Sequence, residues 1–518
     1  MPQVRDEPPP TRPIKSVAII GAGASGAITA AAFHAENYFD RIRVFERRET
    51  AGGTWNYDAN PDHDLTPRPG ALPAETDPPI PLPTLKEGHV RTIKPNAQQR
   101  YHQTPIYDNL TTNVPDIAMS FSDRPFAYGP FVPYWVPRQY IENYFSTHSI
   151  DGFLQLGTTV EDLSKLKDND GWKLTLRKYN GIQQADEWWE ETFDAVVIAN
   201  GHYSIPYIPY VPGLEAYMKK FPQRVQHSKS YRRAADYKRQ KVLIIGNSAS
   251  GHDVTAALLA NAELPVYQSR RSASRWDGAE PPDGIVWKPI VSEYLPNGRI
   301  YFEDGSFLDD VDTIIYCTGY KFSYPFWNSR NNGRALWDYT ENRVPGTYLH
   351  TFLPAHPTIG LVGVPRVLTF RSFEYQAIAL ARVFSGRSKR WGSITEEDKQ
   401  NWDEDRLRLI TREKRRFHDI EWDTGETWTW FQQLFEIAGL GTLGGEGRLP
   451  PVLADKVVWA IENVKKYPEP NKDGLNDGND RRSNRAIQKL DEDAGWIVVG
   501  KGTDEPVLRA KKDLLSYI

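Results

Sequence analysis

The sequence is short of sulfur: its 518 residues include one cysteine, Cys317, and three methionines. A single cysteine excludes an intramolecular disulfide and a dithiol redox pair, and it favours a reducing compartment, which we expect to be the cytoplasm. The eleven histidines lack the spacing of metal ligands, so we expect no metal site. No run of 18 apolar residues is present, which predicts no transmembrane segment, and the start of the chain lacks the apolar stretch of a signal peptide.

A strong charge of one sign is also missing. The formal net charge is −4 at pH 7, from 63 basic and 67 acidic side chains. This balance provides no basic surface for nucleic acid or for an anionic membrane, and we expect neither as a partner. The length predicts two or three domains. It does not determine the oligomeric state, so a homo-oligomer stays an open alternative.

Two glycine-rich turns are the most informative features that the sequence does contain. The first ends the stretch VAIIGAGASG at residues 17–26, and the second ends VLIIGNSASG at residues 242–251. Each follows a β-branched run typical of a buried parallel strand and precedes an alanine-rich helical stretch, the context in which such glycines bind a dinucleotide. The glycines let backbone N–H groups approach a pyrophosphate at the positive end of the helix. Two such turns predict two dinucleotides bound together, a flavin and a nicotinamide.

The first turn is followed by an acidic residue. About 20 residues after its last glycine, Glu46 ends a strand, where a carboxylate accepts hydrogen bonds from ribose hydroxyls and repels a 2′-phosphate. The spacing favours this function over that of a solvated glutamate at a strand end. A flexible turn comes next, where backbone and an indole can pack close to a bound ring. The cofactor-binding residues predicted in this region are Gly21, Gly23, Gly26, Glu46, Gly53, Thr54 and Trp55.

The second turn is followed by the opposite charge. About 20 residues after its last glycine, where an acid would select NAD, the chain has Arg270 and Arg271. Guanidinium groups can hold a 2′-phosphate there through charge-assisted hydrogen bonds, the alternative being a solvated basic loop. The first turn is therefore predicted to bind FAD and the second NADPH. The cofactor-binding residues predicted in the second turn are Gly246, Asn247, Ser248, Ser250 and Gly251.

The order of predicted strands and helices indicates an α/β fold with two Rossmann-like dinucleotide-binding domains, the NADPH domain being inserted into a discontinuous FAD domain. The predicted divisions are 1–206 (FAD domain, first part), 207–324 (NADPH domain) and 325–518 (FAD domain, second part, with a C-terminal extension). Helices are expected at 134–147, 373–384 and 430–438. The proline-rich residues 61–95 predict a long irregular surface segment, and the polar residues 466–484 a mobile one.

Several stretches together resemble the flavin-containing monooxygenases of the single-component type. Residues 221–231 (FPQRVQHSKSY), just before the second turn, look like the FxGxxxHxxxY signature of that family. Further family-like stretches lie at 107–115, 119–126, 199–202, 317–320 and 373–387. The resemblance covers about residues 15–390 in consistent order and fades after about residue 440. The C-terminus lacks the apolar anchor of the family's membrane-bound members.

The resemblance implies a reaction and a catalytic residue. In such enzymes NADPH reduces FAD, O2 adds to flavin C4a, and the resulting hydroperoxyflavin waits for a small-molecule substrate. Asn113 matches the family's amide that stabilises this intermediate together with bound NADP+. An amide can donate and accept in a dry pocket without supplying an acid. The alternative is an ordinary turn asparagine ahead of Pro115.

The same resemblance implies three further cofactor contacts, Thr112, Tyr231 and Gln376, which lie in or at the end of family-like stretches. For Tyr231, as for His227 of the signature, a place in a domain hinge without chemistry is an equal alternative. Two residues depart from the family pattern. Gln223 stands at the usual glycine of the signature, which leaves its turn geometry open. Ser248 replaces the middle glycine of the second turn, from which we expect NADPH to bind more loosely or slightly displaced.

We therefore expect a monooxygenase that transfers one oxygen atom to nitrogen, to sulfur or to an indole-type molecule, in secondary metabolism or detoxification. A Baeyer–Villiger oxygenase uses the same cofactors on a ketone, but Tyr231 at the end of the signature favours heteroatom oxidation. A flavoprotein reductase without oxygenation is another alternative, and a noncatalytic FAD-bound scaffold is a third. The missing cysteine pair and Asn113 argue against the reductase, and the two arginines argue against the scaffold.

Overall fold

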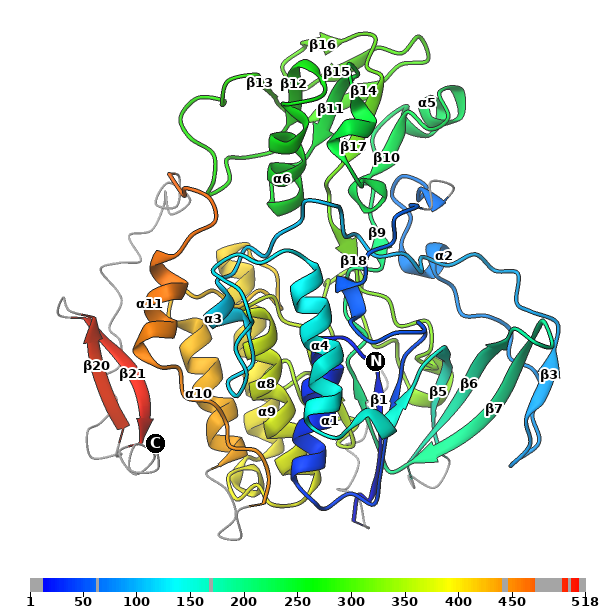
Figure 1. Cartoon of the computed structure of the whole chain (residues 1–518), viewed down its shortest axis with the longest axis vertical. Helices are drawn as coiled ribbons and strands as arrows, with labels where there is room; N and C mark the ends of the chain where they lie inside the picture. The colour runs from blue at the N-terminus through cyan, green and yellow to red at the C-terminus, as the bar shows by residue number, and fades with distance from the viewer. Residues whose placement is uncertain are drawn as a thin grey trace.

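A computed structural model of the chain describes residues 13–61, 65–166, 171–439, 446–470, 496–501 and 505–511. Two parallel five-stranded sheets lie one above the other along its long axis (Figure 1). The lower sheet has the strand order β19-β8-β1-β2-β4. Its strands are β1 (Ser16–Ile20), β2 (Arg41–Phe45), β4 (Leu154–Gln155), β8 (Ala195–Ile198) and β19 (Ile359–Leu361).

The upper sheet has the order β10-β17-β11-β12-β13. Its strands are β10 (Val225–His227), β11 (Lys241–Ile245), β12 (Glu263–Ser269), β13 (Ile285–Lys288) and β17 (Thr313–Tyr316). All of them fall between β8 and β19, which pair with each other in the lower sheet. The predicted insertion of one Rossmann-like unit into the other is thus confirmed, while the division at residues 206 and 324 stays a prediction.

The chain crosses between the two units twice, and the crossings pair with each other. Strand β9 (Ile205–Pro206) leaves the lower unit and β18 (Tyr320–Lys321) returns to it, and the two form an antiparallel ribbon. Because the two connections pair with each other, the chain passes between the units through one short two-stranded ribbon.

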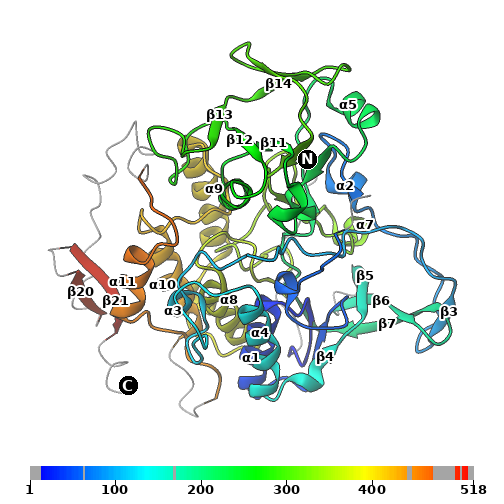
Figure 2. The ribbon, with the colours of Figure 1, turned by 45° about the horizontal axis from the view of Figure 1, so that its top comes forward.

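The lower sheet is covered on both faces, as its apolar strands require. In β1, Val17 and Ile19 face a core shared with helices α1 (Ala24–Ala35), α4 (Trp135–Thr147), α8 (Thr369–Phe384) and α10 (Glu426–Ala438), whereas Ala18 and Ile20 face a second core. That second core includes β5 (Thr158–Lys165) and β6 (Trp172–Asn180). Figure 2 shows these helices on one side of the lower unit and β5 and β6 on the other. Helices α8 and α10 contain the predicted ranges 373–384 and 430–438, and α4 matches 134–147 except for its first residue.

The proline-rich segment is more regular than its sequence indicates. It contains α2 (Pro73–Thr76) and β3 (Arg91–Ile93), and β3 pairs with β7 (Ala185–Phe193) in an antiparallel sheet of order β3-β7-β6-β5. The expectation of an irregular segment was wrong at these positions, because β3 gains its hydrogen bonds from a strand remote in the sequence.

The remaining described elements surround the two sheets. In the upper unit these are α5 (Leu214–Lys220), α6 (Ala249–Leu258), β14 (Val291–Tyr294), β15 (Ile300–Phe302) and β16 (Phe307–Leu308). In the lower unit they are α3 (Asp116–Met119), α7 (Ser329–Asn332), α9 (Glu396–Glu413), α11 (Asp455–Asn463) and the hairpin of β20 (Trp496–Lys501) and β21 (Glu505–Lys511). Of the stretch predicted to be mobile, residues 471–484 lie outside the described residues.

Candidate functional site

The first glycine turn joins β1 to α1 at the carboxyl end of the lower sheet. Gly21 has φ +107°, a left-handed conformation that favours glycine, and a Cβ there would lie 2.6 Å from the carbonyl oxygen of Ala199. A Cβ at Gly26 would lie 1.9 Å from the carbonyl oxygen of Gly21. Only glycine permits this close approach of the helix to the turn, and the resulting cradle fits the pyrophosphate of a dinucleotide.

The carboxylate of Glu46 is fixed beside this turn. Its Oε2 accepts a hydrogen bond from the backbone N–H of Ala22 at 2.9 Å, and its Oε1 accepts one from that of Arg48, also at 2.9 Å. Each oxygen keeps a free lone pair, because a carboxylate offers about four acceptor sites. The buried side chain is therefore fixed in one orientation beside the turn, and its contact with a ribose stays a prediction.

The predicted residues Gly53, Thr54 and Trp55 form a short 3-10 helix, η1 (Gly53–Trp55), that packs against the first turn. A Cβ on Gly53 would lie 2.7 Å from the Cα of Gly23, and a Cβ on Gly23 would lie 3.5 Å from the Cα of Gly53. These two glycines thus meet backbone to backbone. The structure brings all of the residues predicted for the first site into one place.

The second turn repeats this geometry in the upper sheet. Gly246 has φ +110°, and a Cβ on Gly251 would lie 2.1 Å from the carbonyl oxygen of Gly246. Ser248, the departure from the family pattern, has φ −83° and ψ −169°, close to the −78° and −168° of Gly23. Any residue can adopt that backbone conformation, so serine needs no change in the turn. Its side chain is exposed at the start of α6, next to the partly exposed Ser250.

The two arginines after the second turn lie in different environments. A terminal nitrogen of Arg270 is 2.8 Å from Oδ2 of Asp277, and its guanidinium carbon is 3.4 Å from the ring centroid of Trp287. Arg271, in contrast, is exposed. Arg270 is thus fixed in position by stacking and by an ion pair.

Asp277 connects Arg270 to the second turn. Its Oδ2 also accepts hydrogen bonds from the side-chain amide of Asn247 at 2.8 Å and from the backbone N–H of Ser274 at 2.9 Å. Burial raises the pKa of Asp277, but the hydrogen bonds from Ser274, Asn247 and Arg270 outweigh burial and lower the pKa below its ordinary value. The carboxylate is therefore ionised at neutral pH and holds Arg270 beside the turn.

Asn113 lies on a loop that is anchored on both sides. The backbone N–H of Thr112 donates to the carbonyl oxygen of Val132 at 2.8 Å, and the hydroxyl of Thr112 accepts from the N–H of Val132 at 3.1 Å. Pro115, on the other side, is buried and leads into α3. Between these anchors the side chain of Asn113 is exposed. The loop thus fixes the backbone and presents the amide.

Three predicted cofactor contacts are buried and have partners within the protein. Besides Thr112, these are Gln376 and Tyr231. The Gln376 amide accepts from the N–H of Gly363 at 3.0 Å and donates to the Thr351 hydroxyl at 3.0 Å, which ties α8 to the end of β19. The Tyr231 ring packs between other tyrosine rings of the upper unit and of the loop before Thr112. Their contact with a cofactor stays a prediction.

The signature residues before the second turn lie at the crossing between the two units. Nε2 of His227 lies 3.0 Å from the carbonyl oxygen of Gly319, and Nδ1 accepts the N–H of Lys229 at 3.1 Å. Burial and then the charge of Lys229 lower the pKa of His227 to about 3, so the ring is neutral. Gln223, at the usual glycine position, has φ +67°, the left-handed conformation that a glycine there would adopt without strain.

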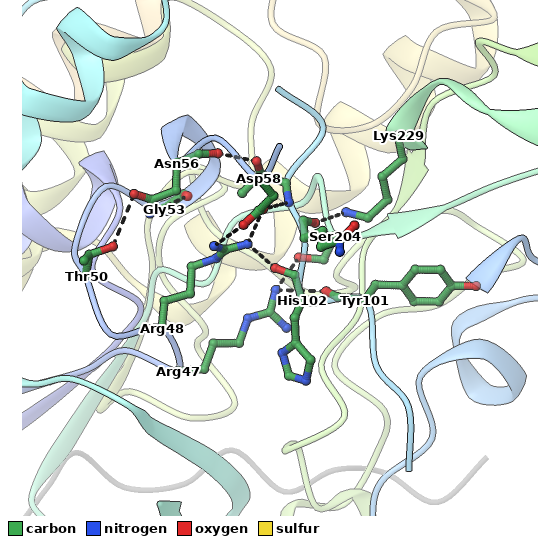
Figure 3. Close-up of polar contacts among 12 residues, drawn as sticks. Arg47, Arg48, Thr50, Gly53, Asn56, Asp58, Tyr101, His102, Ser204 and Lys229 are labelled. Atoms are coloured by element: carbon green, nitrogen blue, oxygen red, sulfur yellow. Dashed lines mark hydrogen bonds and ion pairs between the residues drawn. The ribbon is translucent and has the colours of Figure 1, made fainter. Parts of the chain in front are cut away.

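A polar cluster ties residues 101–103, the segment that follows the proline-rich stretch, to both units (Figure 3). Arg48 pairs with Asp58 at 2.8 Å, and Arg47 donates to the carbonyl oxygen of Tyr101 at 3.3 Å and to the hydroxyl of Ser204 at 3.1 Å. The buried amine of Lys229 donates to the carbonyl oxygen of Gln103 at 2.5 Å. The segment is therefore anchored directly beside Glu46 and the interdomain crossing.

Sequence reasoning missed the acidic residues that organise the second site. Asp277 and Asp253, the latter on α6, each accept hydrogen bonds from more than one segment. Asp277 lies in a loop rich in serine and arginine with no periodic pattern, and Asp253 looks like one polar position on an ordinary helix. No signal in a single sequence distinguishes either from a solvated aspartate.

Models of two known protein families match this chain. The family model described as flavin-binding monooxygenase-like matches residues 93–277 and 283–411, and the model of an NAD(P)-binding Rossmann-like domain matches residues 19–74. The flavin-containing monooxygenase FMO GS-OX1 of Arabidopsis thaliana is 31% identical over 395 residues, covering 72% of this chain and 74% of its own length.

Two solved structures share the fold. The S-allyl-L-cysteine S-oxygenase of Allium sativum superposes with a TM-score of 0.69 at 24% identity, covering 89% of this chain and 94% of its own. Cyclohexanone monooxygenase bound to ε-caprolactone gives a TM-score of 0.54 at 14% identity, with 83% and 98% coverage. Within the described part of the chain, no helix has the length and apolar character needed to cross a membrane.

Proposed function

The chain belongs to the flavin-binding monooxygenase-like family and uses FAD and NADPH, and on that premise we propose that it transfers one oxygen atom from O2 to a nitrogen or sulfur atom of a small molecule. One observation supports this proposal beyond family membership: the signature stretch ends in Tyr231, the residue that favours heteroatom oxidation, and its neutral His227 lies at the crossing between the two units. The oxygen-transfer mechanism that the sequence resemblance implies is part of the proposal.

Separate groups of residues would bind the two cofactors and contact the flavin. The first turn and Glu46 would hold FAD through its pyrophosphate and a ribose, and the second turn would hold the pyrophosphate of NADPH at the start of α6. FAD, once reduced, supplies the reaction with O2 and the transfer of one oxygen atom. Asn113 would donate and accept hydrogen bonds next to the flavin and help to exclude water. Three buried side chains, those of Thr112, Gln376 and Tyr231, would hold these elements in place.

Replacing Arg270 tests the assignment of the second site. We expect Arg270→Ala to weaken NADPH binding by about 1.5–3 kcal/mol, the scale of a hydrogen bond to a charged group, because a 2′-phosphate would lose its donor and face an Asp277 carboxylate whose charge Arg270 no longer balances. NADH lacks that phosphate, so its apparent KM should change much less. Flavin reduction measured with both cofactors gives the ratio.

Arg271→Ala is the matched variant for this test, since Arg271 is adjacent but exposed. If Arg270 carries the preference, Arg271→Ala should reduce it less than Arg270→Ala does. An unchanged preference for NADPH in both variants would place the phosphate site elsewhere.

A substrate screen tests the kind of atom that is oxygenated. Tertiary amines, sulfides and indoles should be compared with cyclic and linear ketones, following NADPH consumption and product mass together. We expect products one oxygen atom heavier from the amines or sulfides, because an electrophilic oxygen donor needs a lone pair or an electron-rich ring. Lactones or esters from ketones, with inert heteroatom substrates, would instead show a Baeyer–Villiger oxygenase.

A further inference from the structure

Asp253 is a junction at which three separate segments of the chain meet. It lies on α6, the helix whose start forms the second turn. Its Oδ2 accepts a hydrogen bond from the hydroxyl of Tyr107 at 2.5 Å, and its Oδ1 accepts one from the hydroxyl of Tyr467. The amine of Lys466 lies 3.5 Å from Oδ2. We call these four residues the Asp253 junction.

One arm of the junction leads to Asn113. Tyr107 begins the loop that continues to Thr111 and Asn113, and the amine of Lys466 donates to the carbonyl oxygen of Thr111 at 3.3 Å. Asp253 and Lys466 therefore contact this loop at Tyr107 and Thr111, shortly before the exposed amide. The loop belongs to the lower unit, whereas α6 belongs to the upper one, so the junction connects the two predicted cofactor sites.

The other arm is the C-terminal segment 464–470, which follows α11 and rises to the upper unit (Figure 1). The ring of Tyr467 packs edge-on against His252, the neighbour of Asp253, with 4.4 Å between ring centroids. Glu469 lies 3.5 Å from Arg275, in the same loop as Asp277. The segment thus contacts both the helix and the loop that surround the second turn.

The segment does not cover the place where a dinucleotide would bind. Ser248 and Ala249, at the start of α6, are exposed, while the contacts of the segment fall one turn further along the helix. The described residues of the segment therefore contact α6 beyond its first turn and leave the start of the helix exposed. Residues 464–470 thus connect the two units without covering the start of α6.

We propose that Asp253 is a positioning residue that couples helix α6 to the Asn113 loop, with Tyr467 and Lys466 completing the connection. This inference rests on the proposed function, because it assigns the two coupled elements to NADPH and to oxygen transfer. The ribbon and the polar cluster around Lys229 lie at the crossing between the units, whereas the Asp253 junction connects α6 directly to the loop that bears Asn113. A carboxylate with two phenol donors and an ammonium provides a strong and directional contact.

The test compares Asp253→Asn and Tyr467→Phe with the wild-type holoenzyme. Both changes nearly preserve shape, so folding should persist. We expect Asp253→Asn to weaken NADP+ binding, measured by calorimetry on the FAD-loaded protein, about tenfold, as for one charge-assisted hydrogen bond. The share of NADPH that ends as hydrogen peroxide should rise. Flavin reduction at saturating NADPH should stay close to wild type, giving a change in KM without a matching change in kcat.

Two control variants separate the junction from general effects of charge and of tyrosine loss. Asp283→Asn removes an exposed carboxylate from the same unit, and Tyr210→Phe removes an exposed hydroxyl near the crossing. Both should behave as wild type.

Adding Tyr467→Phe to Asp253→Asn should change little, because the hydroxyl has already lost its charged partner. Amide hydrogen exchange in α6 and in residues 464–470 should quicken in Asp253→Asn.

Wild-type NADP+ affinity and wild-type peroxide yield in both Asp253→Asn and Tyr467→Phe would overturn the inference. So would an equal loss in Asp283→Asn, since the effect would then be one of charge alone. If the wild-type protein reduces its flavin but oxygenates no substrate, the proposed function fails. The NADP+ affinities and the exchange rates would still decide on the junction in that case.

Discussion

Gly23→Val should leave the protein without FAD. The backbone at Gly23 (φ −78°, ψ −168°) accepts valine, so the obstacle is space and not conformation. A Cβ there would already lie 3.5 Å from the Cα of Gly53, and valine adds two methyl groups beyond it, toward Gly53 or over the start of α1. Overpacking costs about 1–3 kcal/mol in protein interiors, and a pyrophosphate displaced from the helix start loses further contacts. The flavin absorbance of the purified protein gives the FAD content.

Two companion variants sharpen this test. Gly23→Ala adds only the Cβ, at ordinary contact distance, and should retain FAD with reduced affinity. Ser248→Val places the same side chain at the equivalent position of the second turn, where the backbone is nearly identical, and should keep FAD while weakening NADPH. A yellow Gly23→Val protein, or a colourless Ser248→Val protein, would contradict the assignment of FAD to the first turn.

The two turns could be predicted from the sequence because the residues that shape them are contiguous. A strand, a glycine with positive φ and a helix that packs closely follow each other within ten residues, at Gly21 and Gly26 and again at Gly246 and Gly251. The acid after one turn and the arginines after the other lie at the ends of the next strands. Local pattern is therefore sufficient for the fold class and for the backbone geometry of both turns.

The partners of the charged groups could not be predicted in this way. Asp253 is bound by Tyr107 and Tyr467, which lie far from it on either side in the sequence. Such contacts depend on how distant segments pack, and composition alone did not indicate those of residues 466–470, the described part of the stretch 466–484 that was expected to be mobile. Motif membership likewise does not distinguish the exposed Asn113 from the buried Thr112 and Gln376.

Asn113 should matter after flavin reduction and not before it. Asn113→Leu removes an exposed amide from an anchored loop, while Glu46, Arg270 and both turns are unaffected. We expect NADPH to be consumed as before, hydrogen peroxide to accumulate, and product formation to fall about 10²–10³-fold, the typical cost of one pre-organised donor. Simultaneous measurement of NADPH, peroxide and product gives the partition. Rapid mixing of the reduced variant with O2 should show a prompt return to the oxidised flavin spectrum.

Asn109→Leu is the matched control, because Asn109 is exposed on the same loop, between Tyr107 and Asn113. It makes the same change in size and polarity outside the predicted flavin contact, and it should couple NADPH to product as the wild type does. Equal uncoupling in both variants would mean that the loop as a whole excludes water and that the Asn113 amide has no separate effect. Normal oxygenation by Asn113→Leu would leave Asn113 as a turn residue, and would shift the stabilising contact to bound NADP+ and to the Asp253 junction that positions it.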